Sequence, residues 1–179
     1  MKRFTVILSA LVLLAFTLPV FAAETEWKTY TDKKFGFSME YPDLFNAGDD
    51  AYVDSDGISH FGQYTSSSDG DGKYAFEVSG EKTPKGANVD SLLKEETNME
   101  EDDYGYVYGV EPIDGTTKSG ADFYTFDYLD DSAGEEEISH VYCVVGKNVK
   151  VRYWIRYPKD EAERFSDITK RMDASLKLK

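Results

Sequence analysis

The chain is poor in cysteine and in basic charge, and each shortage excludes a class of protein. Cys143 is the single cysteine among 179 residues, so no disulfide can form within the chain. It lies in the apolar run 141–145 with no base beside it, which predicts a small buried residue rather than a nucleophile. Lysine and arginine number 20 against 34 acidic residues, a net charge of −14. Such a surface repels nucleic acid and anionic lipid, so we expect neither as a partner.

Motifs for catalysis are also missing. His60 and His140 are the only histidines, and neither belongs to a serine, cysteine or metal-ligand motif of diagnostic spacing. The sequence has no G-x-S-x-G, no H-E-x-x-H, no phosphate-binding glycine loop and no paired CxxC. Its carboxylates are too numerous to single out an acid and base pair. We therefore expect a protein that is not an enzyme and needs no cofactor.

The first 22 residues have the pattern of an export signal. Lys2 and Arg3 precede an uncharged apolar run over 4–18, and Pro19 breaks it. Val20 and Ala22 supply the small residues of a signal-peptidase site, which predicts cleavage after Ala22. An uncleaved membrane anchor is the alternative, but the run is shorter than the about 20 residues that a span needs. We expect a signal peptide over 1–22, one domain over 23–179, a secreted or periplasmic location and no membrane anchor after cleavage.

Alternating apolar residues predict a protein rich in antiparallel strands. The expected strands cover 27–31, 37–41, 58–64, 74–80, 104–110, 121–129, 138–145 and 149–157, and short glycine, asparagine or aspartate connections join most of them. Helical spacing predicts helices over 88–99 and 158–176. The second carries an apolar stripe of Ala162, Phe165, Ile168 and Met172, which needs a sheet face to cover.

A hairpin around 146–148 defines a candidate binding surface. If these three residues form the loop, Val145 pairs with Val149, and the odd-numbered residues from Val141 to Ile155 share one apolar face. The other face then carries a basic and aromatic stripe of Lys150, Arg152, Trp154 and Arg156. Acidic neighbours could neutralise this stripe, or it could bind a partner protein.

The segment 27–42 resembles the opening of PsbP-like domains, which typically read W/F-x-x-Y-x-D-x-x-x-G-F-S-I-x-Y-P. Trp27, Tyr30, Asp32, Gly36 and Phe37 match it, and the pattern ends at Tyr41 and Pro42. A middle helix, a turn at Asp114-Gly115, a terminal hairpin and a final helix ending in Ser-Leu-Lys follow in the family's order. The resemblance implies an α+β fold, an antiparallel sheet flanked by helices in an α/β/α sandwich. Members share binding to larger partners, and the matching positions are structural, so the resemblance transfers no functional residue.

Two further features leave alternatives open. The fragments Asp54-Ser-Asp-Gly57 and Asp69-Gly-Asp-Gly72 could bind calcium through Asp69 and Asp71 or could be ordinary turns, since neither continues as an EF-hand. The tyrosine stripes over 104–108 and 124–128 could bind a ligand or pack under a helix. The sequence thus favours an exported accessory module that docks on an envelope or secreted protein, with cation or small-ligand binding at the acidic loops as the alternative.

Overall fold

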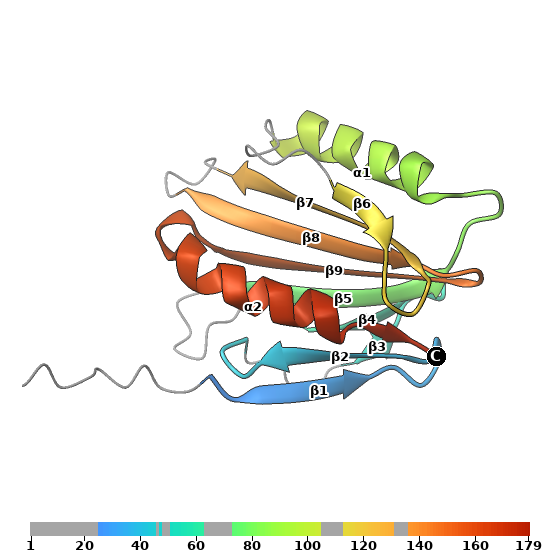
Figure 1. Cartoon of the computed structure of the whole chain (residues 1–179), viewed down its shortest axis with the longest axis horizontal. Coiled ribbons are helices and arrows are strands. Elements are labelled where there is room, and N and C mark those ends of the chain that lie inside the picture. Colours follow the sequence, from blue (N-terminus) through green and yellow to red (C-terminus); the bar gives the residue numbers. More distant parts are fainter. Residues whose placement is uncertain (1–24, 46, 48–50, 63–72, 105–112, 131–135) are drawn as a thin grey trace, which may run out of the picture.

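Two antiparallel sheets and two α-helices make up the described part of the protein (Figure 1). The computed structural model describes residues 25–45, 47, 51–62, 73–104, 113–130 and 136–179. The predicted signal peptide therefore lies outside the described residues. None of the described helices is long and apolar enough to cross a membrane.

The larger sheet has seven strands in the order β3-β4-β5-β9-β8-β7-β6, and the smaller has three in the order β1-β2-β10. The strands are β1 (Trp27–Thr31), β2 (Phe37–Pro42), β3 (Tyr52–Val53), β4 (Ser59–Phe61), β5 (Ala75–Lys82), β6 (Ile113–Thr116), β7 (Asp122–Asp130), β8 (Glu137–Val145), β9 (Val149–Pro158) and β10 (Lys177–Leu178). The helices are α1 (Val89–Tyr104) and α2 (Ala162–Ser175), and a 3₁₀ turn, Lys159–Glu161, precedes α2.

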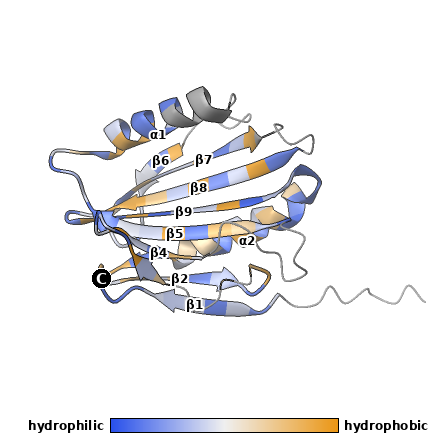
Figure 2. Ribbon diagram, turned by 180° about the vertical axis from the view of Figure 1, so that it is seen from behind, coloured by the Kyte–Doolittle hydropathy of each residue, from blue (hydrophilic) through white to orange (hydrophobic). Residues whose placement is uncertain are grey.

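The seven-stranded sheet is the middle layer of the molecule. Helix α1 packs on one face of β7 and β8, while α2 and the small sheet cover the other face (Figure 1). Figure 2 shows hydrophobic residues on β7, β8 and α2. The predicted α+β class, an antiparallel sheet flanked by helices, is confirmed.

The motif that resembles PsbP-like domains builds the β1–β2 hairpin. Phe37 and Met39 are buried in the main core, and Gly36 turns the chain with a φ of 71°. The buried carboxylate of Asp32 accepts hydrogen bonds from the Phe35 N–H at 2.5 Å and the Tyr30 hydroxyl at 3.2 Å. These positions shape the fold, as the sequence indicated.

The small sheet packs very closely on the large one at Gly80 of β5. A Cβ atom at this position would lie 2.5 Å from Cε1 of Phe37. Only a residue without a side chain leaves room for the ring, so this glycine sets the distance between the two sheets.

The predicted register of the β8–β9 hairpin is wrong by one residue. Val145 lies opposite Lys150 rather than Val149, and Val144 lies opposite Val151. Both faces of β8 are covered, so its residues are buried from Ile138 to Val144 and alternation cannot distinguish the faces. The face toward α2 therefore combines two sets that the prediction kept apart: Ile138, His140, Tyr142 and Val144 with Val151, Tyr153, Ile155 and Tyr157.

Several predicted elements differ at their ends: α2 begins at Ala162 rather than at 158, and Asp114-Gly115, expected as a turn, lies within strand β6. Tyr104 is the last residue of α1 rather than the start of a strand, because no glycine or proline precedes Gly105 to stop the helix. The rest of the predicted strand 104–110 lies outside the described residues. Helix α2 ends at Ser175, one residue earlier than predicted, and Leu176 adopts an extended conformation that leads into β10.

The tyrosine stripe of β7 packs under helix α1, so it is part of the core rather than a ligand-binding surface. Tyr124 and Phe126 are buried in a cluster with Leu92 and Cys143. Glu96 fastens the helix to the sheet, since its carboxylate accepts hydrogen bonds from the Tyr124 hydroxyl and from Arg152. Cys143 is a core residue, as predicted.

Candidate functional site

A largely apolar hollow of about 680 Å³ lies between the C-terminal end of α2 and strand β7. We call it the α2–β7 groove. Its lining combines apolar, hydroxyl and basic side chains: Thr117, Lys118, Ser119, Phe123, Thr125, Tyr142, Lys170, Asp173, Ala174, Leu176, Lys177 and Leu178.

The groove exists because α2 packs on β8 and β9 and leaves this face of β7 beside it. Phe123 forms the outer part of its floor, and its ring lies against Gly115 of β6, where a Cβ would be only 3.0 Å away. Tyr142 continues the floor, with its ring stacked on Phe123 at a centroid distance of 5.4 Å. On the opposite side Leu178 packs on Gly146, where a Cβ would lie 2.7 Å from Cδ1. The result is an aromatic floor with an apolar wall at Leu178.

The rim of the groove is basic although the chain is acidic. Lys118, Lys170 and Lys177 are exposed and line it. Asp173 is the only acidic residue in the lining, and it faces a buried network. Its Oδ1 accepts a hydrogen bond from the Tyr153 hydroxyl and lies 3.4 Å from Nε2 of His140.

His140 sits between two carboxylates. Its Nδ1 lies 2.6 Å from Oδ1 of Asp127, and Asp173 approaches the other ring nitrogen. Burial by itself lowers the pKa of His140, but hydrogen bonds to the two carboxylates outweigh it and raise the pKa to about 9. The imidazole is therefore protonated at neutral pH, and Asp127 and Asp173 share its single positive charge.

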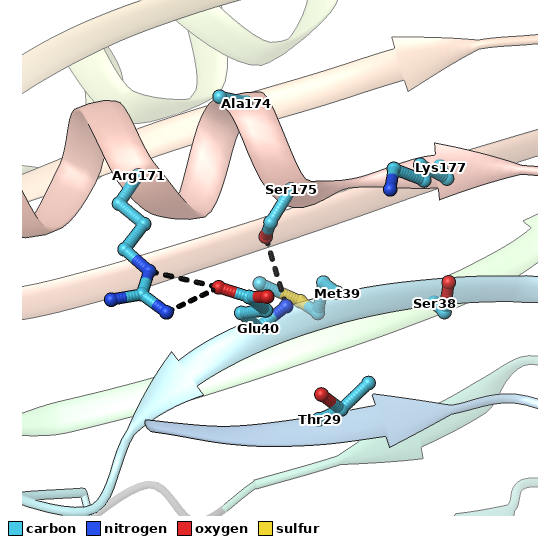
Figure 3. Close-up of a pocket in the computed structure, with 8 residues that line it drawn as sticks. All are labelled: Thr29, Ser38, Met39, Glu40, Arg171, Ala174, Ser175 and Lys177. Atoms are coloured by element: carbon cyan, nitrogen blue, oxygen red, sulfur yellow. Dashed lines mark hydrogen bonds and ion pairs between the residues drawn. The ribbon is translucent and has the colours of Figure 1, made fainter. Parts of the chain in front are cut away.

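A second hollow of about 300 Å³ adjoins the groove, and we call it the polar pocket (Figure 3). Arg171 reaches across it to Oε2 of Glu40 with Nε and a terminal nitrogen at 2.8 Å, and its guanidinium lies 4.0 Å from the centroid of Trp27. Ser175 Oγ accepts a hydrogen bond from the Glu40 N–H at 2.8 Å. Ala174 and Lys177 line both hollows, so the two meet where α2 passes into β10.

The basic and aromatic stripe of β9 lies on one face, as predicted, and acidic neighbours contact every member. Lys150 Nζ lies 2.7 Å from Glu81, Arg152 contacts Glu96, Trp154 Nε1 lies 3.3 Å from Glu77, and Arg156 Nε lies 3.3 Å from Glu137. The side chains of the three basic residues are 17–29% exposed. Acidic side chains of neighbouring elements thus neutralise the stripe, and its role in binding a partner stays a prediction.

His60 belongs to a separate polar cluster on β4. Its Nδ1 lies 2.6 Å from Glu77 and its Nε2 lies 3.2 Å from Asp54, while Tyr52 stacks on the ring at 4.8 Å. Burial lowers the pKa of His60, but the two carboxylates raise it above its usual value. Among the described residues, no three histidine, cysteine, aspartate or glutamate side chains are arranged to hold a metal ion.

The first D-x-D-G fragment is a turn in the structure. Oδ1 of Asp54 accepts hydrogen bonds from the N–H groups of Asp56, at 3.0 Å, and Ile58, at 2.8 Å. Asp69 and Asp71 of the second fragment lie outside the described residues, so calcium binding there stays a prediction.

Sequence reasoning missed the groove. Its residues come from segments 117–125 and 170–178 and from Tyr142 of β8, and no local pattern connects them. The one available signal was the presence of three lysines, Lys170, Lys177 and Lys179, among the last ten residues of an otherwise acidic chain.

No protein-family model and no curated protein matches the chain, but solved structures do. Cyanobacterial PsbP (CyanoP) from Synechocystis sp. PCC 6803 superposes with a TM-score of 0.59 at 12% identity, over 89% of this chain and 96% of that one. A Pseudomonas aeruginosa protein of unknown function, described as a putative regulator, has a TM-score of 0.54 at 13% identity, over 86% and 98%. A Bacteroides thetaiotaomicron protein has a TM-score of 0.53 at 15% identity, over 85% of this chain and 48% of that one. At these identities the likeness concerns the fold alone.

Proposed function

The chain has a PsbP-like fold, and on that premise we propose that it is an exported accessory module without catalytic activity. In this proposal the module docks on a protein partner in the cell envelope or outside the cell. The signal-like pattern of residues 1–22 supports export. The chemistry of the α2–β7 groove supports docking.

The observation that carries the proposal is the apolar, aromatic-floored groove. Its volume of about 680 Å³ lies in the range of sites that receive a ligand or an anchoring side chain. Ile113 extends the apolar surface, because it pairs with Thr125 across β6 and β7 and thus shares its face. This isoleucine is 53% exposed. Exposed apolar surface of this kind, next to buried aromatic rings, is typical of a docking site.

The groups that line the groove favour binding over catalysis. The hydroxyls of Thr117 and Ser119 lie 2.9 Å apart and hydrogen-bond to each other, and Thr117 also accepts the Ala121 N–H. Asp173 is committed to Tyr153 and His140. A nucleophile needs a base beside it, and among these lining residues none is placed in that way.

Photo-crosslinking in the native host tests docking. A benzophenone amino acid at Ile113 should form one discrete covalent adduct with a partner that mass spectrometry identifies, and Phe123→Asp should abolish it. The matched control places the same group at Lys94, which is exposed on α1 away from the groove. Equal adducts at Ile113 and Lys94, or an adduct that survives Phe123→Asp, would refute docking through the groove.

Export has its own test. N-terminal sequencing of the protein recovered outside the cytoplasm should begin at Ala23. A protein that stays in the cytoplasm with residues 1–22 attached would contradict the export part of the proposal.

A further inference from the structure

We infer that the partner segment in the α2–β7 groove combines apolar side chains with flanking carboxylates. The inference rests on the proposed function and names the chemistry of the partner. Three features of the groove support it: the lysines at the rim, the position of Asp173 beside His140, and the continuity of the groove with the polar pocket.

Two of the rim lysines are uncompensated. Several basic residues elsewhere in the chain lie beside carboxylates, as Lys150 does with Glu81 and Arg171 with Glu40. Among the residues that the structure describes, Lys118 and Lys177 have no such neighbour. Lys170 has only Asp167, at 3.6 Å, and both side chains are more than 70% exposed, which makes the pair weak. Three cations thus surround an apolar floor.

Asp173 does not cancel this positive rim. Its carboxylate oxygen faces Tyr153 and the protonated ring of His140, which also contacts Asp127. One imidazolium and two carboxylates leave this inner cluster with a single net negative charge, against three positive charges at the rim. An incoming segment therefore meets the three lysines as the dominant charges at the rim.

The shape of the surface gives the segment a direction. The small side chain of Ala174 separates the groove from the polar pocket, and Lys177 lines both (Figure 3). A segment whose apolar side chains lie over Phe123 and Tyr142 can leave the groove across Ala174. A carboxylate at that end is then within reach of Lys177, and a second carboxylate of the segment can pair with Lys118 in the turn before β7.

A protein segment fits this surface better than nucleic acid or an anionic membrane. The chain carries a net charge of −14, which repels extended arrays of phosphate. A short segment with one or two carboxylates experiences mainly the nearby lysines, since salt screens charges more than about 10 Å away. Local complementarity of this kind selects a partner and orients it.

Three synthetic hexapeptides test the inference by NMR titration of the isotope-labelled exported protein. The first has four leucine and phenylalanine residues between terminal aspartates, the second has lysines in place of the aspartates, and the third has serines in place of the apolar residues. The first should shift the amide signals of Phe123, Tyr142 and Leu178. We expect it to bind about tenfold more tightly than the second at low salt, with the difference shrinking as salt is added.

Reversing the charge of two rim lysines supplies the second part of the test. Lys118→Glu combined with Lys177→Glu should reverse the preference between the first two peptides, while Lys94→Glu on α1 should leave it unchanged. All three lysines are exposed, so folding should survive, and circular dichroism checks this. Equal binding of the first two peptides would overturn the charge inference and leave docking in the groove intact. If neither apolar peptide shifts the groove signals, the proposed function and the inference both fail.

Discussion

Raising the pH from 6.5 to 9.5 should destabilise the folded protein through His140. This imidazole is 8% exposed and lies between Asp127 and Asp173. Burial opposes its charge, but the hydrogen bonds to both carboxylates raise its pKa from the usual 6.5 to about 9. The folded state therefore holds a proton that the unfolded chain releases at lower pH.

The raised pKa determines both the sign and the size of the change in unfolding free energy. A raised pKa stabilises the fold fully below pH 6.5, and the stabilisation disappears as the pH rises through about 9. The difference between a pKa of 6.5 and one of about 9 corresponds to roughly 3 kcal/mol of unfolding free energy. Domains are stable by only about 5–15 kcal/mol, so the loss is large. For a domain of this size it lowers the Tm by about 10 °C.

Urea unfolding between pH 6.5 and 9.5 measures the effect, and His140→Gln is the matched variant. The variant starts from a lower stability, so the two proteins are compared by how steeply their unfolding free energy falls with pH. This slope should be much flatter in the variant than in the unchanged protein. NMR of the imidazole protons gives the pKa directly. The chain has two histidines, so His60→Gln assigns both signals.

Two results would refute the reasoning. A midpoint of His140 at or below 6.5 would mean that the two carboxylates do not hold the proton. Equal slopes in the unchanged protein and His140→Gln would mean that other groups cause the pH dependence.

Three further predictions concern packing. Gly80→Ala should cost about 1–3 kcal/mol of unfolding free energy, because the new Cβ would overlap the Phe37 ring, and an unchanged urea midpoint would contradict this. Cys143 has no exposed surface and burial raises its pKa to about 12, so Ellman's reagent should label it only after unfolding, and rapid labelling of the native protein would be inconsistent with a core position. Glu96→Ala removes the carboxylate that bonds to Tyr124 and Arg152, which should cost about 2 kcal/mol and speed amide hydrogen exchange in α1; unchanged exchange there would show that Glu96 does not fasten the helix.

Several elements could be predicted from the sequence because short-range patterns determine them. β1 has the predicted bounds, since its alternation, Asp32 and Gly36 act within ten residues of one another. Helix α2 buries Phe165, Ile168 and Met172 of the predicted stripe, because that stripe follows from helical geometry alone.

Tertiary structure decided which face of each strand meets which layer. The β8–β9 register departs from the prediction because α1 and α2 cover opposite faces of the same sheet, so apolar residues at consecutive positions of β8 are all buried. For the same reason the stripe of β9 finds its carboxylates on other elements: Glu77 and Glu81 on β5, and Glu96 on α1.

The groove depends on long-range packing in the same way. It forms where the end of α2 crosses β8, so that Lys118 and Lys177, 59 positions apart in the sequence, line one hollow. The sequence by itself determined the composition, the signal-like leader, the helix stripe and most strands, because these depend on neighbouring residues. The register, the pairing of charges and the groove depend on contacts between distant segments, and only the folded chain brings those together.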